Sequence, residues 1–469
     1  MSEKVANKQI FMTQTKIPKL IVVLAIPAMI SMLITSIYNM ADTYFVGQIG
    51  DKISGTSAVS IVFSYMSIMQ ALGFFFGHGS GNYISKMLGK GDGKSADEMA
   101  SIGFFSSFIL GTLFLIAGII FLEPFAVLLQ ANPENMQDVK SYLFYILLGS
   151  PFIMTSFVLN NQLRFQGSAY YGMIGIGVGA LINIALDPLL IFGFNMGVGG
   201  AGLATSISQM VSFVVLFVMS TRSGSIKVNL ANFKPTWEKY KQIIIGGTPS
   251  LIRQGFASVS VMVLSDVAYE VGGNALVAGM GVGARIMHFI FSILLGIGQG
   301  FQPVCGYNYG AKRYDRVLQG YRFTIVSSSV IVIVFSVICF IFAPQFAMLL
   351  NSDPAVYTIA GTSLRFQFVV FITMPFVVAT NMMLQTIGRV VGASLLSTIR
   401  QGVIYIPALY LFSMLSLGQV GVFLAQPIAD FVAFIIAIPF AIKEIKSLKS
   451  KIEKQKAEQN ILKRGQVEE

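Results

Sequence analysis

Two aspartates, Asp42 and Asp187, stand in segments that are otherwise apolar, and each follows a polar residue by four positions. Tyr38 precedes Asp42, and Asn183 precedes Asp187. Residues four apart lie on one face of a helix, so each pair would present its polar groups to the same side. A carboxylate is costly in apolar surroundings, and one that is kept there calls for a functional reason.

Paired carboxylates of this kind suit ion-driven chemistry. If Asp42 and Asp187 face a common cavity, they repel each other, so that one holds a proton or both share a cation. The oxygens of Asp42, Asp187 and Asn183 suit Na⁺ as well as a proton, and the sequence leaves this choice open. The alternative is that both aspartates are solvated at the ends of spans and have only a structural role. This alternative applies most directly to Asp42, which is near the end of the first span.

The remaining ionisable residues within or near the spans carry weaker expectations. Asp266 and Glu270 stand where a span ends, and we expect them to be solvated. Asp430 lies inside the last span, four residues after Gln426, and pairing with a cation of the same half would stabilise it. The candidates for that pairing are Arg253, Arg285 and Arg400. Each of them could equally bond helix-end carbonyls or extend toward the membrane surface.

The elements that must position these residues are membrane spans. Of 469 residues, 54% are hydrophobic and only 11% are charged, and the mean hydropathy is +0.72. This composition indicates an all-α polytopic membrane protein. Hydropathy predicts about twelve transmembrane helices, at 17–46, 54–85, 99–121, 139–165, 170–193, 198–220, 240–268, 275–308, 317–342, 358–387, 391–414 and 418–442.

Loop charge predicts the orientation of these spans. Basic residues gather before the first span, after the second, between the sixth and seventh, and after the eighth, whereas the alternate loops are nearly bare apart from Lys52 and Lys140. By the positive-inside rule both termini are cytoplasmic, in a multi-pass protein of the cell inner membrane. Much of the net charge of +11 lies in the basic tail, which suggests contact with anionic lipid and not with nucleic acid.

The two halves of the sequence repeat. Residues 125–133 match 346–354, and the same shift of 221 brings Asn160 onto Asn381. A repeat of this length predicts two pseudo-symmetric six-helix lobes, related about the membrane normal. The domains expected are an N-terminal lobe at 1–221, a cytoplasmic linker at 222–239, a C-terminal lobe at 240–442 and a basic cytoplasmic tail at 443–469. In the second half, Ile406 stands at the position that matches Asp187.

Several functional classes lack support in the sequence. There is no phosphate-binding loop, and the glycine-rich run at 77–81 is typical of close helix packing, with His78 expected to serve in packing. Cys305 and Cys339 are far apart in sequence and predict small buried side chains, without a metal or a disulfide. Because no nucleophile–base or metal constellation appears, we expect no enzyme activity.

The chain resembles the multidrug and toxic compound extrusion (MATE) family over nearly its full length, and most of all its prokaryotic DinF-like branch. The features that carry the resemblance are Ile26-Pro27, Tyr38…Asp42-Thr-Tyr-Phe-Val-Gly47, Asn183…Asp187-Pro-Leu-Leu-Ile-Phe-Gly193 and Gly199-Gly-Ala-Gly-Leu-Ala-Thr205. The resemblance implies a V-shaped cleft between the lobes, open alternately to either side, and a kink near Pro27 that accompanies protonation. It also implies a coupling-ion site formed by Asp42 and Asp187, with lining residues Tyr38, Asn160, Asn183 and Thr205.

The function implied is that of a secondary active antiporter that exports lipophilic, often cationic drugs in exchange for H⁺ or Na⁺. We expect a monomer in contact with membrane lipid, without a cofactor. The NorM-like branch has an acid on its seventh helix, but the stretch that starts at Arg253 has none, which favours coupling in the first lobe. Two alternatives remain: a flippase for lipids or polysaccharide precursors, which would need cationic groups in the cleft, and a membrane sensor that transports nothing.

Overall fold

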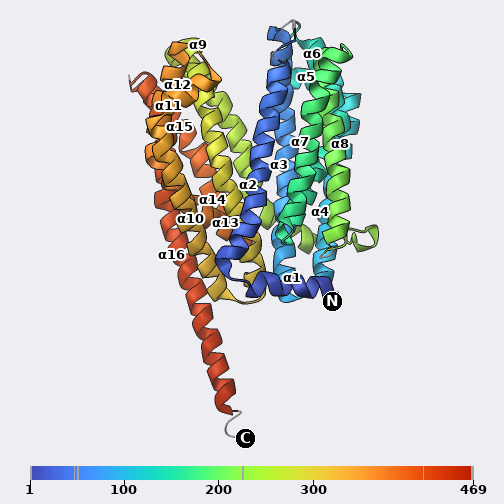
Figure 1. The fold of residues 1–469 in the computed structure, drawn as a ribbon, viewed down its shortest axis with the longest axis vertical. Coiled ribbons are helices and arrows are strands. Elements are labelled where there is room, and N and C mark those ends of the chain that lie inside the picture. The colour runs from blue at the N-terminus through green and yellow to red at the C-terminus, as the bar shows by residue number, and fades with distance from the viewer. Residues whose placement is uncertain (1–2, 47, 50–51, 224–225, 416, 466–469) are drawn as a thin grey trace.

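Helices form the whole of the protein's regular structure within residues 3–46, 48–49, 52–223, 226–415 and 417–465, which the computed structural model describes. They gather into two groups that stand side by side (Figure 1). The helices of the N-terminal group are α1 (Glu3–Gln14), α2 (Ile17–Val46), α3 (Lys52–Lys90), α4 (Gly93–Ile120), α5 (Leu122–Leu128), α6 (Met136–Phe165), α7 (Ala169–Pro188) and α8 (Gly197–Ser223). Those of the C-terminal group are α9 (Trp237–Gly310), α10 (Tyr314–Ile341), α11 (Ala343–Leu350), α12 (Pro354–Phe371), α13 (Met374–Ile387), α14 (Val390–Thr398), α15 (Tyr405–Met414) and α16 (Gln419–Gly465).

The predicted set of twelve spans is confirmed, although three spans have unexpected forms. Ten of the described helices are long and apolar enough to cross a membrane, and α12 with α13 adds one span that is bent by 60°. The 74 residues of α9 hold two spans, because the helical backbone breaks at Gly272 and Gly273. A π-helical turn, Ile399–Val403, interrupts the predicted span 391–414. The basic tail continues α16 without a break.

Polar caps mark where helices begin outside the membrane. Asp92 caps α4 by accepting hydrogen bonds from the backbone N–H and the hydroxyl of Ser95, at 3.0 and 2.6 Å. These bonds hold the pKa of the Asp92 carboxyl below its ordinary value. Asp353 caps α12 in the same way through the N–H of Ala355, and Pro354 occupies the first turn, where its missing N–H costs nothing.

The sequence repeat is visible in the backbone. Left-handed residues recur with the same spacing of 221 residues, as Gly91 (φ 83°) and Lys312 (φ 59°), Gly167 (φ 81°) and Gly388 (φ 94°), and Gly197 (φ 55°) and Gly418 (φ 54°). The bounds of α4 and α10 differ by 221 at both ends. Because few residues other than glycine adopt positive φ, these turns are reliable markers of equivalent positions. The counterpart of Gly418 is therefore Gly197.

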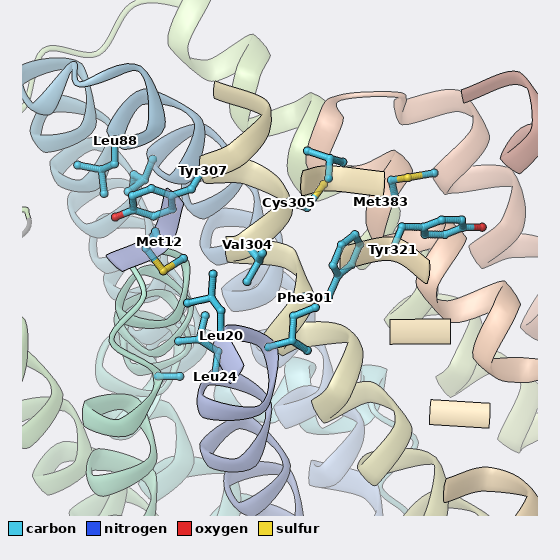
Figure 2. Packing of buried hydrophobic residues seen from close by; sticks show 14 of the residues in the cluster. Met12, Leu20, Leu24, Leu88, Phe301, Val304, Cys305, Tyr307, Tyr321 and Met383 are labelled. Atoms are coloured by element: carbon cyan, nitrogen blue, oxygen red, sulfur yellow. The ribbon is translucent and has the colours of Figure 1, made fainter. Parts of the chain in front are cut away.

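The two lobes are held together at the end where α1 lies (Figure 1). On the N-terminal side, Lys8 of α1 donates to Ser168, and Gln9 donates to the Gly89 carbonyl at 3.1 Å. On the C-terminal side, Arg313 donates to the Thr13 carbonyl at 2.6 Å. Apolar packing continues this junction: Met12, Leu20 and Leu24 belong to one cluster with residues of α9 such as Phe301 and Val304 (Figure 2). The helix α1 thus acts as a strap across both lobes.

Glycines bring the helices of the two lobes into backbone contact. A Cβ atom added to Gly300 would lie 2.6 Å from the Cα of Ala25, and one added to Gly89 would lie 2.1 Å from the carbonyl oxygen of Tyr307. Small residues permit such close approach in membranes, where helix association depends on van der Waals packing. A side chain of any size at these positions would force the lobes apart.

We expect Gly300→Ala to destabilise the protein, because its methyl group would meet the backbone of Ala25. Overpacking of this kind typically costs about 1–3 kcal/mol. The buried thiols Cys305 and Cys339 react with a fluorogenic maleimide only on unfolding, so a thermal ramp of detergent-purified protein measures the change. Gly281→Ala in the same helix is the matched control, because no heavy atom lies within 4 Å of its added Cβ. An unfolding temperature equal to that of the Gly281→Ala variant would contradict the packing argument.

Candidate functional site

The N-terminal lobe buries a carboxylate in a chain of polar contacts between α7 and α8. Asp187 is fully buried, and its Oδ1 accepts a hydrogen bond from Nδ2 of Asn183 at 3.2 Å. The same amide nitrogen lies 3.4 Å from Oγ1 of Thr205 on α8. The four-residue spacing of Asn183 and Asp187 puts both on one face of α7, as the sequence predicts.

Asp42 of α2 joins this cluster. Its carboxylate lies close enough to Asp187 for the two charges to repel each other, and its Oδ2 accepts a long hydrogen bond of 3.5 Å from the hydroxyl of Tyr142. Tyr142, on α6, also lies near Asp187 and the Thr205 hydroxyl. The structure therefore brings the two predicted aspartates together, in the interior of the lobe and not in water. The sequence analysis missed Tyr142, because a tyrosine in an apolar span usually serves packing and carries no distinguishing signal.

Three oxygens of the cluster have no hydrogen-bond partner among the described residues. They are Oδ1 of Asp42, Oδ2 of Asp187 and Oδ1 of Asn183, and all three are buried. Buried polar atoms are nearly always paired, so an unpaired set in one place leaves room for a ligand that these atoms would satisfy. Oxygen ligands of this kind suit a proton on a carboxylate or a hard cation such as Na⁺.

A cavity of about 490 Å³ adjoins the cluster, and four of the predicted site residues line it: Tyr38, Asn160, Asn183 and Thr205. Thr35 of α2 and Gln209 of α8 also line the cavity, and neither was expected. Pro27 lies away from the cavity on the same helix as Tyr38. It is buried, its carbonyl accepts a bond from Ser31 at 2.8 Å, and α2 is helical on both sides of it.

In the C-terminal lobe the three buried or membrane-level arginines separate into different roles. Arg400 is the cation that pairs with Asp430, at 2.8 Å, and its guanidinium lies 4.0 Å from the ring centre of Phe291. Gln426 donates to the same oxygen of Asp430, also at 2.8 Å. Arg253 lines a second cavity, of about 380 Å³, together with Arg400. Arg285 is exposed.

His78 does more than pack, because it joins the two lobes by hydrogen bonds. Its Nε2 lies 2.8 Å from the guanidinium of Arg164, and its Nδ1 lies 2.7 Å from the hydroxyl of Ser250 on α9. A guanidinium can only donate, so Nε2 accepts and Nδ1 donates. Gln385 of α13 donates to the same hydroxyl at 2.7 Å. The glycines that flank His78 pack as expected, with Gly79 against Ile243 of the other lobe.

Helices of this length arranged as two repeats around buried polar cavities define a polytopic membrane transporter. The MatE family model matches the chain twice, over residues 27–189 and 249–411. The multidrug export protein MepA of Staphylococcus haemolyticus (strain JCSC1435) is 29% identical over 92% of this chain and 95% of its own length. MepA of Staphylococcus saprophyticus subsp. saprophyticus is 30% identical, over 88% and 91%.

Solved structures lead to the same family. A multidrug resistance MATE family transporter of the MOP superfamily, solved in an outward-facing conformation, superposes with a TM-score of 0.87. It is 28% identical to this chain, and the alignment covers 96% of this chain and 99% of the other. The chain belongs to the MATE family, and the predicted fold of two six-helix lobes around a V-shaped cleft is confirmed.

The geometry predicts which carboxyls carry protons. We expect dicyclohexylcarbodiimide, an apolar reagent that attacks protonated carboxyl groups, to label Asp42 or Asp187, and the labelling to fall as the pH is raised. Asp430 should be labelled less than either, because its ion pair with Arg400 favours the ionised form. Peptide mass spectrometry of the membrane-embedded protein measures all three sites at once. Labelling of Asp430 in preference to the other two would contradict this interpretation.

Proposed function

We propose that the protein is a secondary active antiporter that exports lipophilic, often cationic compounds in exchange for H⁺ or Na⁺. The observation that carries this proposal is the Asp42–Asp187 pair, with its unpaired oxygens, beside the cavity of the N-terminal lobe. An ion that enters would satisfy those oxygens and cancel the repulsion between the carboxylates. The same negative charge would attract a cationic solute, so ion and solute compete for it.

The exchange would proceed through neutralisation of this charge. When ions move down their gradient and bind Asp42 and Asp187, the cationic solute loses its counter-charge and leaves. Pro27 supplies the weak point in α2, because a proline has no N–H to donate to the preceding turn of the helix. Bending there would carry Tyr38 and Asp42 with it. The lobes would then rock so that the cavity opens to the other side.

We further propose the orientation and the setting. Both termini lie in the cytoplasm of an inner-membrane protein, because the basic loops are on their side. The strap α1 would then close the cytoplasmic end, so the structure represents an outward-facing state. The protein would work as a monomer, without a cofactor, on small-molecule substrates.

A second candidate function is that of a flippase for lipids or polysaccharide precursors. The observation that favours it is the cavity of the C-terminal lobe, which Arg253 and Arg400 line and which would suit a phosphate group. Transfer of a lipid-linked sugar between leaflets, in vesicles that show no drug transport, would favour this candidate over efflux.

The coupling proposal predicts that Asp42→Asn and Asp187→Asn each abolish gradient-driven export of a fluorescent cation. An amide keeps the shape of the carboxyl but neither binds a proton in the relevant range nor supplies a negative charge. Flux is measured in everted vesicles under an imposed proton or sodium gradient. The gradient that drives export identifies the coupling ion.

Asp266→Asn is the matched control, because Asp266 is an exposed carboxylate of α9. This variant should retain export. Membrane insertion and thermal stability of all three variants show whether a loss reflects coupling or folding. Export at the level of the unmodified protein by both Asp42→Asn and Asp187→Asn would overturn the coupling site.

A further inference from the structure

The cavity of the C-terminal lobe is the symmetry counterpart of the cavity of the N-terminal lobe. The same shift of 221 residues that relates the left-handed turns also relates their walls: Asn160 corresponds to Asn381, Ile176 to Ser397 and Gly179 to Arg400. Each residue of these pairs lines its own cavity. The fold therefore builds the same hollow twice, and the two hollows differ in the side chains that face them.

The difference is one of charge. The N-terminal cavity adjoins two aspartates, and its wall at position 179 is a glycine packed against Ser212. The C-terminal cavity has two arginines instead, with Arg400 at the equivalent of Gly179. In the register of 221 the position that matches Asp187 is Ala408, which is apolar, as is the Ile406 of the sequence comparison. The two halves thus present opposite polarity around the same shape.

Arg253 is the unpaired member of the cationic side. Asp430 accepts from Arg400, so Arg400 already has its counter-ion. The guanidinium of Arg253 has no hydrogen bond or ion pair within the described residues. Its charged neighbours are cations as well, because Arg164 and Arg400 both lie close enough for repulsion.

Charge in this region does not balance. Arg164 is buried against His78 and Asn161, which are neutral partners, so among the described residues Asp430 is the one carboxylate that pairs with any of these three guanidinium groups. Arg253 is half-buried and lines the cavity, and an unpaired charge at membrane depth is expensive because a guanidinium cannot escape by losing its proton. An anionic group at Arg253 would restore much of the balance. The planar fork of donors on arginine suits a carboxylate or a phosphate, which it can hold by two parallel bonds.

We propose that Arg253 is an anion-binding residue of the C-terminal cavity and that it holds the carboxylate of amphipathic solutes that this protein exports. The inference rests on the proposed efflux function and assigns to Arg253 the selection, among its solutes, of those that carry a carboxylate. A zwitterion would match the cleft as a whole, because its cationic part would face the aspartates of one lobe and its carboxylate the arginine of the other. The aromatic and aliphatic walls, among them Phe291 and Leu295, would take its apolar body.

The test uses one dye in two forms: a rhodamine whose xanthylium cation carries a free benzoate, and its methyl ester. Full-length protein is reconstituted in phosphatidylcholine vesicles, and export of each form is measured under the driving gradient. We expect Arg253→Gln to lower the preference for the acid over the ester by about tenfold, since a bond to a charged group is lost. Arg253→Lys should keep part of the preference, because it retains the charge but not the fork.

Arg285→Gln is the matched control, because Arg285 is an exposed arginine of the same helix. It should leave the ratio of acid to ester unchanged. Equal losses for the two dye forms in Arg253→Gln would assign Arg253 a structural role and overturn the proposal. An unchanged ratio in that variant would overturn it as well.

Equilibrium binding separates this inference from the efflux proposal. Fluorescence anisotropy of each dye on the purified protein needs no gradient, so it reports the preference for the acid even if the unmodified protein transports neither form. If the unmodified protein shows no flux but binds the acid in preference to the ester, and Arg253→Gln removes that preference, the antiporter proposal is overturned. The anion site at Arg253 is then retained. If phosphatidylglycerol in the vesicles abolishes the preference, the anion at Arg253 is a lipid headgroup, and the assignment to a solute is overturned.

Discussion

The cost of holding charge inside an apolar slab governs this protein. Few charges are admitted there, and those around the two cavities differ in sign, since Asp42 and Asp187 adjoin one cavity and Arg253 and Arg400 line the other. A charge in such a place must be paired, be neutralised or wait for a ligand. Asp430 is paired, since Arg400 and Gln426 both donate to it. Within the described part of the chain, Asp42, Asp187 and Arg253 have no ion-pair partner, and the proposed functions lie with these three residues.

This contrast separates structural from functional carboxylates. Removal of either partner from the Arg400–Asp430 pair leaves a buried charge without compensation, which is destabilising whatever the protein transports. Asp42 and Asp187 repel each other instead, so under the coupling proposal their neutralisation would release free energy that is available for a change of conformation. An ion gradient can act through the second kind of site, because the binding of an ion changes the balance between two states of the protein.

The sequence predicts what a single helix or a periodic pattern determines. The spans follow from hydropathy, the repeat follows from a constant shift, and the contact of Asn183 with Asp187 follows from the helical period. Contacts between distant elements left no such signal: Tyr142 reaches Asp42 from another helix, and His78 reaches Ser250 across the lobes. The predicted gap between the spans 240–268 and 275–308 coincides with the break in α9, but hydropathy carries no signal that the backbone stays helical up to Gly272 and Gly273.

The position of α2 explains how an event at Asp42 could reach the junction of the lobes. This helix carries Asp42 beyond Pro27, and on both sides of Pro27 it lies in backbone contact with α9, where Ala25 meets Gly300 and Met29 meets Gly296. Packed glycine contacts tolerate little gradual deformation, since a small shift produces either a clash or a gap. Bending of α2 near Pro27 would therefore loosen that contact outright. Neutralisation of one carboxylate would in this way favour separation of the lobes at the end that α1 straps together.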